Sequence, residues 1–520
     1  MPNLSIASAR HAFEKDELLR EKARPFEAGW FFKRASSFKR VCLLTGDATI
    51  FMACVFIGYY LSAGLKHYYF PELSQITPEK AISSFPLLFG LPMILLLILS
   101  EMQGHYSRFK GFWEEYGEFI RSVAIVVGVT TAYLFLARQH FSRFWFVSTW
   151  LVILVSVPAG RVLVKHWMMH SGVWFSPTVV IGSGRNALES ALAMESNILM
   201  GFKVVALIDV NKHDGDCIEE SEPIEDFLSG RKKTFPVYPF TTDVLGNLEV
   251  NGAPYLVLAV ETEDYDKHRN VLERMAATRF NMSIIPPLRG LPLFGTEISP
   301  IFRHEVLHMR IRNNLARTGF RAVKRVFDAV ISALLLLVLA PVFLYLGYQI
   351  KKDGGPIFYS QQRIGRQGKP FRCYKFRSMV VDADSVLDEI LSGNLEFRDQ
   401  WVREQKLKDD PRITQIGRRL RKYSLDELPQ LWNVLKGDMS LVGPRPVLAD
   451  ELARYGNSAS YYLQIPPGIT GLWQVSGRNN LSYETRVNLD SWYVRNWSLW
   501  YDITILFKTI KVVFTRDGAY

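Results

Sequence analysis

Four apolar runs near the start of the chain are each long enough to cross a lipid bilayer, and they restrict the fold more than any other feature. A membrane-spanning helix needs about 20 apolar residues, and the runs cover approximately residues 41–65, 85–102, 118–138 and 144–166. The sequence therefore predicts four transmembrane helices within residues 41–170. Residues 1–40 are polar and charged, which predicts a cytoplasmic N-terminal segment without a cleavable signal peptide.

Basic residues predict the orientation of this bundle. Those at its two ends are Lys33, Arg34, Lys39, Arg40, Arg161 and Lys165. Because loops rich in lysine and arginine tend to stay in the cytoplasm, both ends of the bundle are expected there. Arg138 and Arg143, in the short third loop, fit this orientation less well. Asp47 interrupts the first run and is expected to face other helices rather than lipid.

The net charge indicates which partners the chain prefers. The formal net charge is +11, which suits nucleic acid, anionic lipid or phosphorylated substrates. No zinc-finger spacing or basic-aromatic module occurs, so we expect lipid and phosphate as partners and no nucleic acid. The four cysteines are scattered, without disulfide or metal-ligand spacing, which favours domains in a reducing cytoplasm.

A fifth apolar run, residues 326–350, carries Asp328 near its start and Pro341 past its middle. Basic clusters lie on both sides of it: Arg317, Arg321, Lys324 and Arg325 before, and Lys351, Lys352, Arg363 and Arg366 after. An ordinary span would put one cluster outside the cell, against the charge rule. A helix that breaks at Pro341 and returns to the same face avoids this conflict, because proline removes a helical hydrogen bond. We therefore expect a re-entrant membrane helix, with an ordinary span as the alternative.

Residues 176–300 alternate strand and helix patterns, which predicts a Rossmann-like domain with a parallel sheet. The turn at 182–187 has the form G-x-G-x-x-A, a variant of the dinucleotide fingerprint, and Asp209 ends the second strand. Glycines there serve either a ligand or simply a tight turn. The Tyr-x-x-x-Lys pair of sugar dehydratases is missing, so we interpret the domain as a scaffold, dimerisation or regulatory surface. Residues 301–325 are predicted to form a basic linker.

Cations recur in Gly- and Pro-rich stretches between Gly354 and Gly477. The candidates for binding phosphate are Lys375, Arg377, Arg412, Arg421, Arg445 and Arg478. Guanidinium groups are preferred partners of phosphate oxygens. Arg445 stands between Pro444 and Pro446, where a stiff backbone suits a side chain that must point at a ligand.

The acidic pair Asp426-Glu427 lies at the centre of this region. Ser424 has the spacing of a helix capping box with Glu427, whereas a helix that starts near Asp426 puts Pro429 in its first turn, where no donor is needed. Either start leaves both carboxylates at a helix N-terminus, which favours their ionised forms and attracts phosphate. An ionised carboxylate is a nucleophile and also a ligand for Mg²⁺. The residues expected to face the core are Leu428, Leu431, Trp432 and Leu435.

The final segment offers one apolar helical face, which suits either the membrane surface or a buried core. This face comprises Ile503, Leu506, Phe507, Ile510, Val513 and Phe514.

The motifs of the last third of the chain resemble those of the bacterial sugar transferase family, the polyprenol-phosphate hexose-1-phosphate transferases. The resemblance rests on KRVFD, SLDELPQLWNVLKGDMSLVGPRP and PGITGLWQVSGRN. With its four spans and middle domain, the whole chain is similar to the long forms of the family. This implies a membrane α-helical bundle, an α/β Rossmann-like domain and, over residues 351–520, a monotopic α-rich α/β catalytic domain with a re-entrant helix. The family commonly has Ser-Pro at the helix break, whereas this chain has Ala340-Pro341.

The resemblance also implies a covalent mechanism in two steps. Asp426 would attack the β-phosphate of a UDP-sugar and release UMP, and undecaprenyl phosphate would then take up the sugar phosphate. Glu427 would act as a base or as a partner of Mg²⁺, the expected cofactor, which Asp426 and Glu427 would hold. Lys375, Arg421 and Arg445 would bind phosphate.

The family implies a bacterial inner-membrane protein, with the catalytic domain on the cytoplasmic face and a homodimer as the expected assembly. The sugar is expected to be galactose, with glucose as the alternative, in the first membrane step of O-antigen, capsule or exopolysaccharide synthesis. Two other functions remain open from the residues alone: a membrane-anchored nucleotide-sugar dehydratase and a non-catalytic scaffold. The missing Tyr-x-x-x-Lys pair argues against the dehydratase.

Overall fold

The computed structural model divides the chain into two compact units. One comprises Met1–Asp226 and Arg231–Pro287, and the other comprises Phe227–Gly230 and Leu288–Tyr520. The structure describes residues 29–69, 77–107, 109–138, 141–212, 219–225, 232–240, 255–268, 282–288, 290–291, 296–300, 307–311, 314–393, 398, 410–477 and 481–515.

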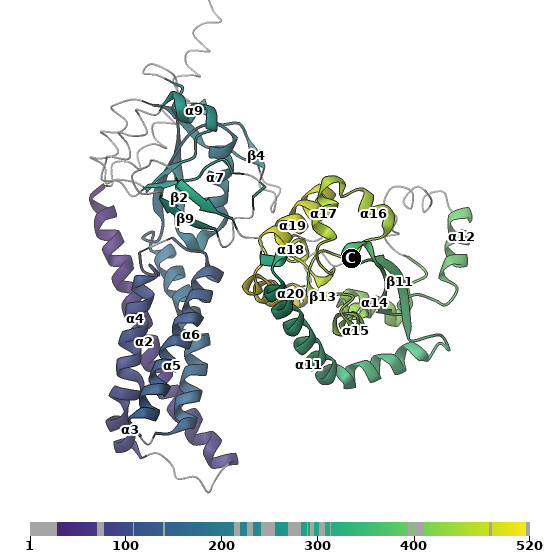
Figure 1. Ribbon diagram of the computed structural model, residues 1–520, viewed down its shortest axis with the longest axis horizontal. Coiled ribbons are helices and arrows are strands. Elements are labelled where there is room, and N and C mark those ends of the chain that lie inside the picture. Colours follow the sequence, from purple (N-terminus) through teal and green to yellow (C-terminus); the bar gives the residue numbers. More distant parts are fainter. Residues whose placement is uncertain are drawn as a thin grey trace, which may run out of the picture. The chain divides into compact units, whose positions relative to one another are not determined.

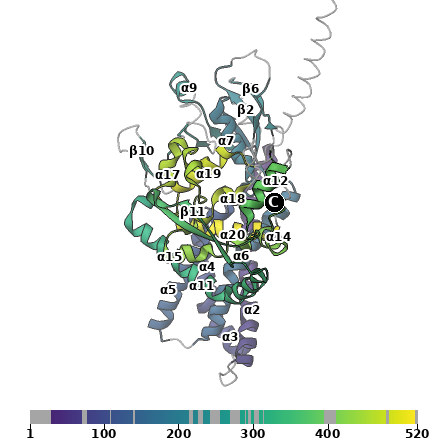
Figure 2. The same cartoon turned by 90° about the vertical axis from the view of Figure 1, so that its right-hand side faces the viewer.

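Four helices of the first unit run side by side as a bundle (Figure 1, Figure 2). A short helix α3 (Pro78–Phe85) and a π-helical turn η2 (Pro86–Gly90) lead into the second of them. The four are α2 (Gly29–Tyr69), α4 (Leu91–Met102), α5 (Phe112–Leu136) and α6 (Arg143–His170). By length and composition each can cross a membrane, α4 together with the turns before it. The prediction of four candidate spans is confirmed at this level.

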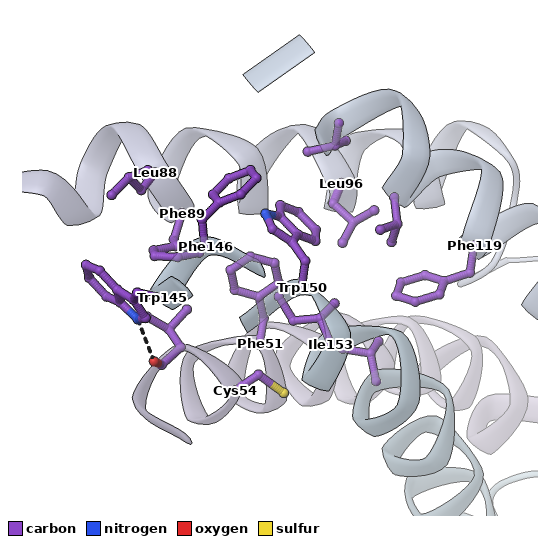
Figure 3. Close-up of a cluster of buried hydrophobic side chains, with 14 of the residues drawn as sticks. Phe51, Cys54, Leu88, Phe89, Leu96, Phe119, Trp145, Phe146, Trp150 and Ile153 are labelled. Atoms are coloured by element: carbon purple, nitrogen blue, oxygen red, sulfur yellow. Dashed lines mark hydrogen bonds between the residues drawn. The ribbon is translucent and has the colours of Figure 1, made fainter. Parts of the chain in front are cut away.

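Aromatic side chains from different helices fill the middle of the bundle (Figure 3). Phe51 meets Trp150 edge to face with ring centroids 5.8 Å apart, and Phe89 lies 4.8 Å from Trp145. The Trp145 indole Nε1 donates a hydrogen bond to the Val55 carbonyl at 3.1 Å, the dashed line in Figure 3. Such contacts hold helices together in lipid, where there is little hydrophobic drive for association.

Asp47, the acidic residue of the first run, is buried among polar partners. The Arg161 Nε donates to both Asp47 oxygens at 2.9 Å, and the Tyr106 hydroxyl donates to Asp47 at 2.7 Å. Arg161 also contacts Glu115 at 3.1 Å, and Glu115 pairs with Lys165 at 2.5 Å. The prediction that Asp47 faces other helices is confirmed. Opposite charges compensate one another here, as a charge inside a bundle requires.

The same unit contains a parallel sheet with strand order β3-β6-β2-β1-β7-β8, in which only the edge pair β3–β6 is antiparallel. Helix α7 (Arg185–Ser196) follows β1 and packs Ala187 and Ala191 against the sheet. The strands are β1 (Ser176–Ile181), β2 (Phe202–Asp209), β3 (Glu219–Glu220), β6 (Pro236–Pro239), β7 (Tyr255–Leu258) and β8 (Met282–Ile284). Smaller elements are η3 (Ile198–Met200), β4 (Ile224–Glu225), β5 (Lys232–Lys233) and α9 (Thr262–Lys267). The predicted α/β domain is confirmed.

Contacts join this sheet to the bundle. The Phe109 ring, in the loop between α4 and α5, lies 4.3 Å from Phe202 and 5.2 Å from Tyr255 of the sheet domain. Lys39 of α2 donates to the Ser176 hydroxyl at 2.9 Å. The bundle and the Rossmann-like domain therefore share one packed unit.

The second unit is an α-rich domain with short strand pairs. A hairpin of β9 (Glu297–Pro300) and β10 (Leu307–Arg310) lies partly in the predicted linker. A second hairpin joins β11 (Phe358–Ile364) to β12 (Pro370–Phe376), and β13 (Ser440–Val442) pairs in parallel with β14 (Gly468–Thr470). The helices and turns are η4 (Asn314–Ala316), α11 (Thr318–Lys351), η5 (Arg366–Gly368), α12 (Ala383–Gly393), α14 (Gln415–Lys422), η6 (Leu425–Glu427), α15 (Gln430–Lys436), α16 (Ala449–Ala453), η7 (Gly456–Ser458), α17 (Ala459–Tyr462), α18 (Leu472–Ser476), α19 (Tyr483–Arg495) and α20 (Leu499–Thr515).

Helix α11 contains the fifth apolar run and begins eight residues earlier than predicted, at Thr318 rather than residue 326. Its start is buried in polar contacts: Lys324 donates to Asp502 at 2.7 Å, and the Ser440 hydroxyl donates to Asp328 at 2.7 Å. Its end packs Leu346 and Ile350 into a cluster with Phe376 and Leu420. Both ends of α11 therefore contact the rest of the second unit, and Figure 1 shows the helix bent between them. The exposed middle makes α11 a fifth candidate for membrane insertion.

Helix α20 has one buried side and one exposed side, and the predicted apolar face is partly exposed. Ile505 is buried, whereas Phe507 and Ile510 are exposed. Trp497 is buried beside this helix, where its indole donates to Asp502 at 3.0 Å.

Candidate active site

The acidic pair lies on a tight turn rather than on a regular helix. Asp426 and Glu427 belong to the 3₁₀ turn η6, and α15 starts only at Gln430. Ser424 has φ 54° and makes no side-chain cap, so the capping-box interpretation is wrong. Left-handed φ values are uncommon outside glycine and asparagine, and the bend at Ser424 turns the chain directly before the carboxylates.

Helix α15 fixes this turn against the domain core. Its Leu431 and Val434 are buried, but Trp432 is 52% exposed, which corrects the prediction that Trp432 faces the core. The Asn433 side chain accepts from the Tyr374 amide at 3.1 Å and donates to the Arg372 carbonyl at 2.7 Å. These two bonds tie α15 to strand β12.

The tie to β12 brings Lys375 to the acidic pair. The Lys375 Nζ donates to Glu427 Oε1 at 2.6 Å, and both side chains are roughly a quarter exposed. Within the described part of the chain, no ion pair includes Asp426. The two neighbouring carboxylates therefore differ: Glu427 is paired with Lys375, and Asp426 has no ion pair among the described residues.

The pKa values of the two carboxylates move in opposite directions. Burial raises the pKa of Asp426 above its usual 3.8, and Glu427 adds to this effect, while Lys375 and Arg421 oppose it. Burial alone would raise the pKa of Glu427 too, but the charges of Lys375 and Arg445 and the lysine hydrogen bond lower it overall.

Arg421 approaches the pair from α14. Its Nε donates to the Ser378 hydroxyl at 2.9 Å, and burial lowers its pKa while Asp426 and Asp410 oppose that effect. Thr414 caps α14 by accepting from the Gly417 amide at 3.0 Å. Gly417 must lack a side chain, because a Cβ there would lie 1.9 Å from the Ser378 carbonyl oxygen. This close packing places Arg421 beside the turn.

Arg445 is exposed on the Gly-Pro-Arg-Pro loop, as its two proline neighbours predicted. The loop is braced by Arg363, whose Nη1 donates to the Pro446 carbonyl at 3.3 Å. Gly443 and Gly468 touch backbone to backbone, since a Cβ on Gly468 would lie 2.1 Å from the Gly443 nitrogen. The loop therefore presents the Arg445 guanidinium from a rigid base.

Two predicted phosphate ligands have structural partners instead. Arg377 donates to the carbonyls of Pro356, Met379 and Ile350 and pairs with Asp353, which fixes the turn after α11. Arg412 forms a two-pronged pair with Asp410 at 2.8 and 2.7 Å.

The side chains of Arg377 and Arg412 are buried and already bind these protein groups. We therefore no longer count them among the residues that bind substrate phosphate. Arg478 lies outside the described residues. The predicted break at Pro341 lies inside α11, which continues as one helix from Thr318 to Lys351.

Sequence reasoning missed three residues that build this site. Asn433 lies on the otherwise apolar face of α15, and that polar exception was the available signal. Arg363 was considered only as a membrane flank, although it braces the Arg445 loop. Ser378 carried no signal of its own, because its role depends on the long-range approach of α14.

The residues present fit a shared Mg²⁺ rather than a metal held by the protein alone. Among the described residues, no group of three or more His, Cys, Asp or Glu side chains could hold a metal ion. Mg²⁺ usually binds one or two carboxylates together with substrate phosphates. Asp426 and Glu427 supply two carboxylates, and their mutual repulsion contributes to the raised pKa of Asp426.

The glycine turn of the Rossmann-like domain is occupied by one of its own side chains. Glu261, directly after β7, accepts from the Asn186 amide at 2.7 Å at the start of α7. A Cβ on Gly184 would lie 3.0 Å from the Glu261 carboxylate oxygen. In dinucleotide-binding sheets a pyrophosphate takes this place, at the helix N-terminus beside the switch point between two central strands.

The domain also matches a known protein family. A model described as a CoA-binding domain matches residues 101–286. A diphosphate does not fit the turn as it stands, because it would meet the Glu261 carboxylate on the same amide.

The remaining comparisons concern the whole chain and its last third. A model described as bacterial sugar transferase matches residues 319–516. The undecaprenyl-phosphate galactose phosphotransferase of Salmonella typhimurium is 42% identical over 89% of this chain and 94% of its own length. The UDP-galactose-lipid carrier transferase of Erwinia amylovora is 44% identical over 80% and 84%. The exopolysaccharide production protein ExoY of Sinorhizobium fredii is 52% identical over 38% of this chain and 88% of its own length.

The Salmonella and Erwinia relatives are both named as transferases, unlike the dehydratase and scaffold alternatives. Identity extends through the bundle, the sheet domain and the acidic turn, since it covers most of both chains. The chain therefore belongs to the bacterial sugar transferase family and is a membrane-associated enzyme.

Proposed function

We propose that the enzyme transfers galactose-1-phosphate from UDP-galactose to undecaprenyl phosphate, which gives undecaprenyl-diphospho-galactose and UMP. The observation that carries the proposal is the open carboxylate of Asp426, which is flanked by Glu427, Lys375 and Arg421. The names of the two long relatives support galactose as the sugar. The product would be the first lipid-linked sugar of an O-antigen, capsule or exopolysaccharide.

The proposed reaction has two displacements at one phosphorus. In the first, an Asp426 oxygen bonds to the β-phosphorus, and the bond from that phosphorus to the bridging oxygen breaks. The electron pair leaves on UMP, and the sugar phosphate stays on Asp426. In the second, an oxygen of undecaprenyl phosphate bonds to the same phosphorus and the Asp426 carboxylate is released.

The other residues have supporting roles in this proposal. Lys375 and Arg421 neutralise charge on the transferred phosphate, and Arg445 approaches the diphosphate from the Gly-Pro-Arg-Pro loop. Glu427 acts as a base or as a Mg²⁺ partner. A Mg²⁺ bound by Asp426 and Glu427 would supply further neutralisation of phosphate charge.

The proposal includes a re-entrant α11 in the bacterial inner membrane, with the catalytic unit on the cytoplasmic face. The contacts at both ends of α11 with one unit support it, as do the basic residues that flank the helix on both sides. A homodimer remains a prediction from the family resemblance.

Transfer of label from UDP-[¹⁴C]galactose to extractable lipid tests the activity, with UDP-glucose in a parallel reaction. Asp426→Asn is expected to abolish transfer, while Glu427→Gln leaves a trace, since a nucleophile is harder to replace than a base. Asp450→Asn, an exposed acidic residue on α16, is the matched control. Near-normal transfer by Asp426→Asn would contradict the assignment of Asp426 as the nucleophile. Faster transfer from UDP-glucose than from UDP-galactose would mean that the donor sugar is glucose.

A further inference from the structure

The end of the Gly-Pro-Arg-Pro loop pairs with strand β11 through a side chain. Val447, the residue after the loop, forms an isolated antiparallel bridge with Ile364, the last residue of β11. The Ile364 amide donates to the Val447 carbonyl at 3.0 Å. In a hydrogen-bonded antiparallel pair the second amide returns the bond. Here the Val447 amide donates to the Tyr462 hydroxyl at 3.2 Å, and that hydroxyl donates to the Ile364 carbonyl at 2.7 Å.

The Tyr462 hydroxyl is therefore a spacer on one side of this pair. A direct bond between an amide and a carbonyl spans about 2.9 Å, whereas the hydroxyl connects these two groups through two successive bonds. One side of the pair is thus wider than the other, and the orientation of the loop relative to β11 depends on one oxygen atom. Arg445 lies on this loop, two residues before Val447.

Tyr462 is itself firmly held. It ends α17 and is 2% exposed, in a cluster with Val447 and Tyr455. The Tyr455 ring meets it edge to face with centroids 5.5 Å apart, and the Tyr455 hydroxyl donates to Asp490 of α19 at 3.0 Å. A buried tyrosine is most often only a part of the core. Tyr462 differs, because its hydroxyl bonds to two chain segments at once and one of them leads to Arg445.

The opposite end of the loop is fixed independently of this pair. Val442, the last residue of β13, accepts through its carbonyl from Lys324 of α11 at 3.1 Å and from the Tyr493 hydroxyl of α19 at 3.0 Å. Because this end is fixed, a change in the pairing at the other end changes the direction in which the middle of the loop points. Arg445 lies in that middle part.

The strand that the spacer contacts also belongs to the active site. β11 pairs along its length with β12, which carries Lys375 opposite Tyr359. Lys375 donates to Glu427 at 2.6 Å. The hairpin thus holds one cation of the site, and the loop holds another, Arg445. Because the Tyr462 hydroxyl joins these two elements, it fixes the place of one cation relative to the other.

We propose that Tyr462 is a positioning residue, whose hydroxyl sets the distance between the Arg445 loop and the β11–β12 hairpin so that Arg445 and Lys375 together fit the diphosphate of the nucleotide sugar. This inference rests on the proposed function, in which both cations bind substrate phosphate. A guanidinium group binds phosphate oxygens through directed hydrogen bonds, so its place and orientation matter as well as its charge. Tyr462 acts through Arg445 and not by touching the substrate.

Two tyrosine-to-phenylalanine variants separate this role from packing. Tyr462→Phe keeps the buried ring and removes the spacer, so the two backbone groups that it joins can bond to each other directly. Tyr483→Phe is the matched control, because Tyr483 packs against the same cluster and its hydroxyl donates to the Glu451 carbonyl at 3.1 Å, outside the loop. Each variant is made in the full-length parent enzyme and also in combination with Arg445→Met.

Three measurements are made on each enzyme. The first is kcat/KM for whichever of UDP-galactose and UDP-glucose the parent uses faster, so that a wrong sugar does not affect the test. The second is the dissociation constant of UDP by isothermal titration, which reports binding of a diphosphate without any chemistry. The third is a melting curve, which shows whether the variant is folded.

Tyr462→Phe is expected to lower kcat/KM about ten- to hundredfold, the order of effect when a group of the active site is displaced by about 1 Å. UDP binding should weaken as well. In the Arg445→Met background, Tyr462→Phe should change kcat/KM less than about twofold, because a residue that acts only through another shows no further effect once that other is removed. Tyr483→Phe should match its parent in both backgrounds.

Several results would overturn the inference. Parental kcat/KM and UDP affinity in Tyr462→Phe would do so. Equal losses in both backgrounds, or a Tyr462→Phe enzyme that does not fold, would mean that the hydroxyl serves the domain core and not Arg445. Parental values in Arg445→Met would contradict both the inference and the proposed role of Arg445. Failure to detect a covalent intermediate would count only against the proposed mechanism, since UDP affinity still tests Tyr462.

Discussion

Asp426 and Glu427 are adjacent in the chain, yet Lys375 contacts only Glu427 directly. Lys375 donates to Glu427 at 2.6 Å, and its charge lowers the pKa of both carboxylates. Burial and Glu427 act the other way on Asp426, so its pKa stays above 3.8. A nucleophilic carboxylate must be ionised, so the rate should fall as the pH falls through this pKa.

Lys375→Met should therefore move the acid limb of the kcat/KM profile to higher pH. Loss of a nearby positive charge raises a carboxyl pKa, because Lys375 now lowers the pKa of Asp426. The rate at neutral pH should also drop, because phosphate neutralisation is lost. Lys436→Met, at the end of α15, removes a lysine that pairs with Asp438 away from the turn and should leave the limb in place. An unmoved acid limb in an active Lys375→Met enzyme would contradict the role of Lys375.

At the residue scale, the sequence predicted the kind of side chain needed but not which partners each would find. The spacing of Asp426, Glu427 and the Gly-Pro-Arg-Pro loop is local and could be recognised directly. Arg377 and Arg412 looked equivalent to Arg421, because composition does not reveal that Asp410 and three backbone carbonyls engage them. Such pairing depends on contacts made only in the folded domain.

At the element scale, α11 is long enough to cross a membrane, but its two ends both contact the second unit, as the ends of a re-entrant helix would. Asp328, which a simple span would bury in lipid, accepts from the Ser440 hydroxyl of the catalytic unit. Hydropathy alone could not distinguish these two cases, since a 34-residue helix with a long apolar run is compatible with both. The early start at Thr318 was missed because Arg321, Lys324 and Arg325 end the apolar run, whereas in the structure Lys324 pairs with Asp502 and the helix continues through it.

Single-cysteine labelling with a membrane-impermeant reagent checks the return of α11. On a cysteine-free background, Ser299→Cys and Ser360→Cys lie on exposed strand positions on either side of the helix. Both should be protected in intact cells and labelled after lysis. Lys80→Cys, in the predicted outer loop, should be labelled in intact cells. Pro341→Leu removes a break worth about 3 kcal/mol and should shift some molecules toward a true span. Labelling of Ser360→Cys alone from outside would contradict re-entry.

The glycine turn after β1 is another element that the sequence left undecided. With Glu261 on the Asn186 amide, we expect no saturable binding of CoA or NAD to the enzyme by isothermal titration. Glu261→Ala should lower the melting temperature of the first unit, because it removes the acceptor at the start of α7. Glu263→Ala, exposed on α9, is the control and should melt like the parent. Saturable binding of CoA that no ligand of the active site displaces would contradict the conclusion that Glu261 occupies the glycine turn.

At the scale of the whole molecule, the bundle and the sheet domain behave as one unit and the catalytic residues belong to another. Phe109, from a loop between helices of the bundle, packs into the sheet domain, and the match to the CoA-binding model, residues 101–286, includes both this loop and the sheet. Alternating patterns revealed the sheet, but this packing has no periodic signal. Lys375, Arg421, Asp426 and Arg445 all lie in the second unit.

A chain reduced to Leu288–Tyr520 should therefore fold, associate with membranes and retain part of the transferase activity. This fragment keeps α11 and the groups that contact both of its ends. ExoY of Sinorhizobium fredii, which matches 198 residues of this chain over 88% of its own length, has a similar extent. Label transfer to lipid, measured beside circular dichroism and vesicle flotation, checks the expectation, and Asp426→Asn within the fragment sets the background. The reduced chain loses the membrane helices of the first unit, so we expect a lower rate at limiting undecaprenyl phosphate. A folded, membrane-bound fragment without any transfer would mean that the bundle and sheet domain complete the active site.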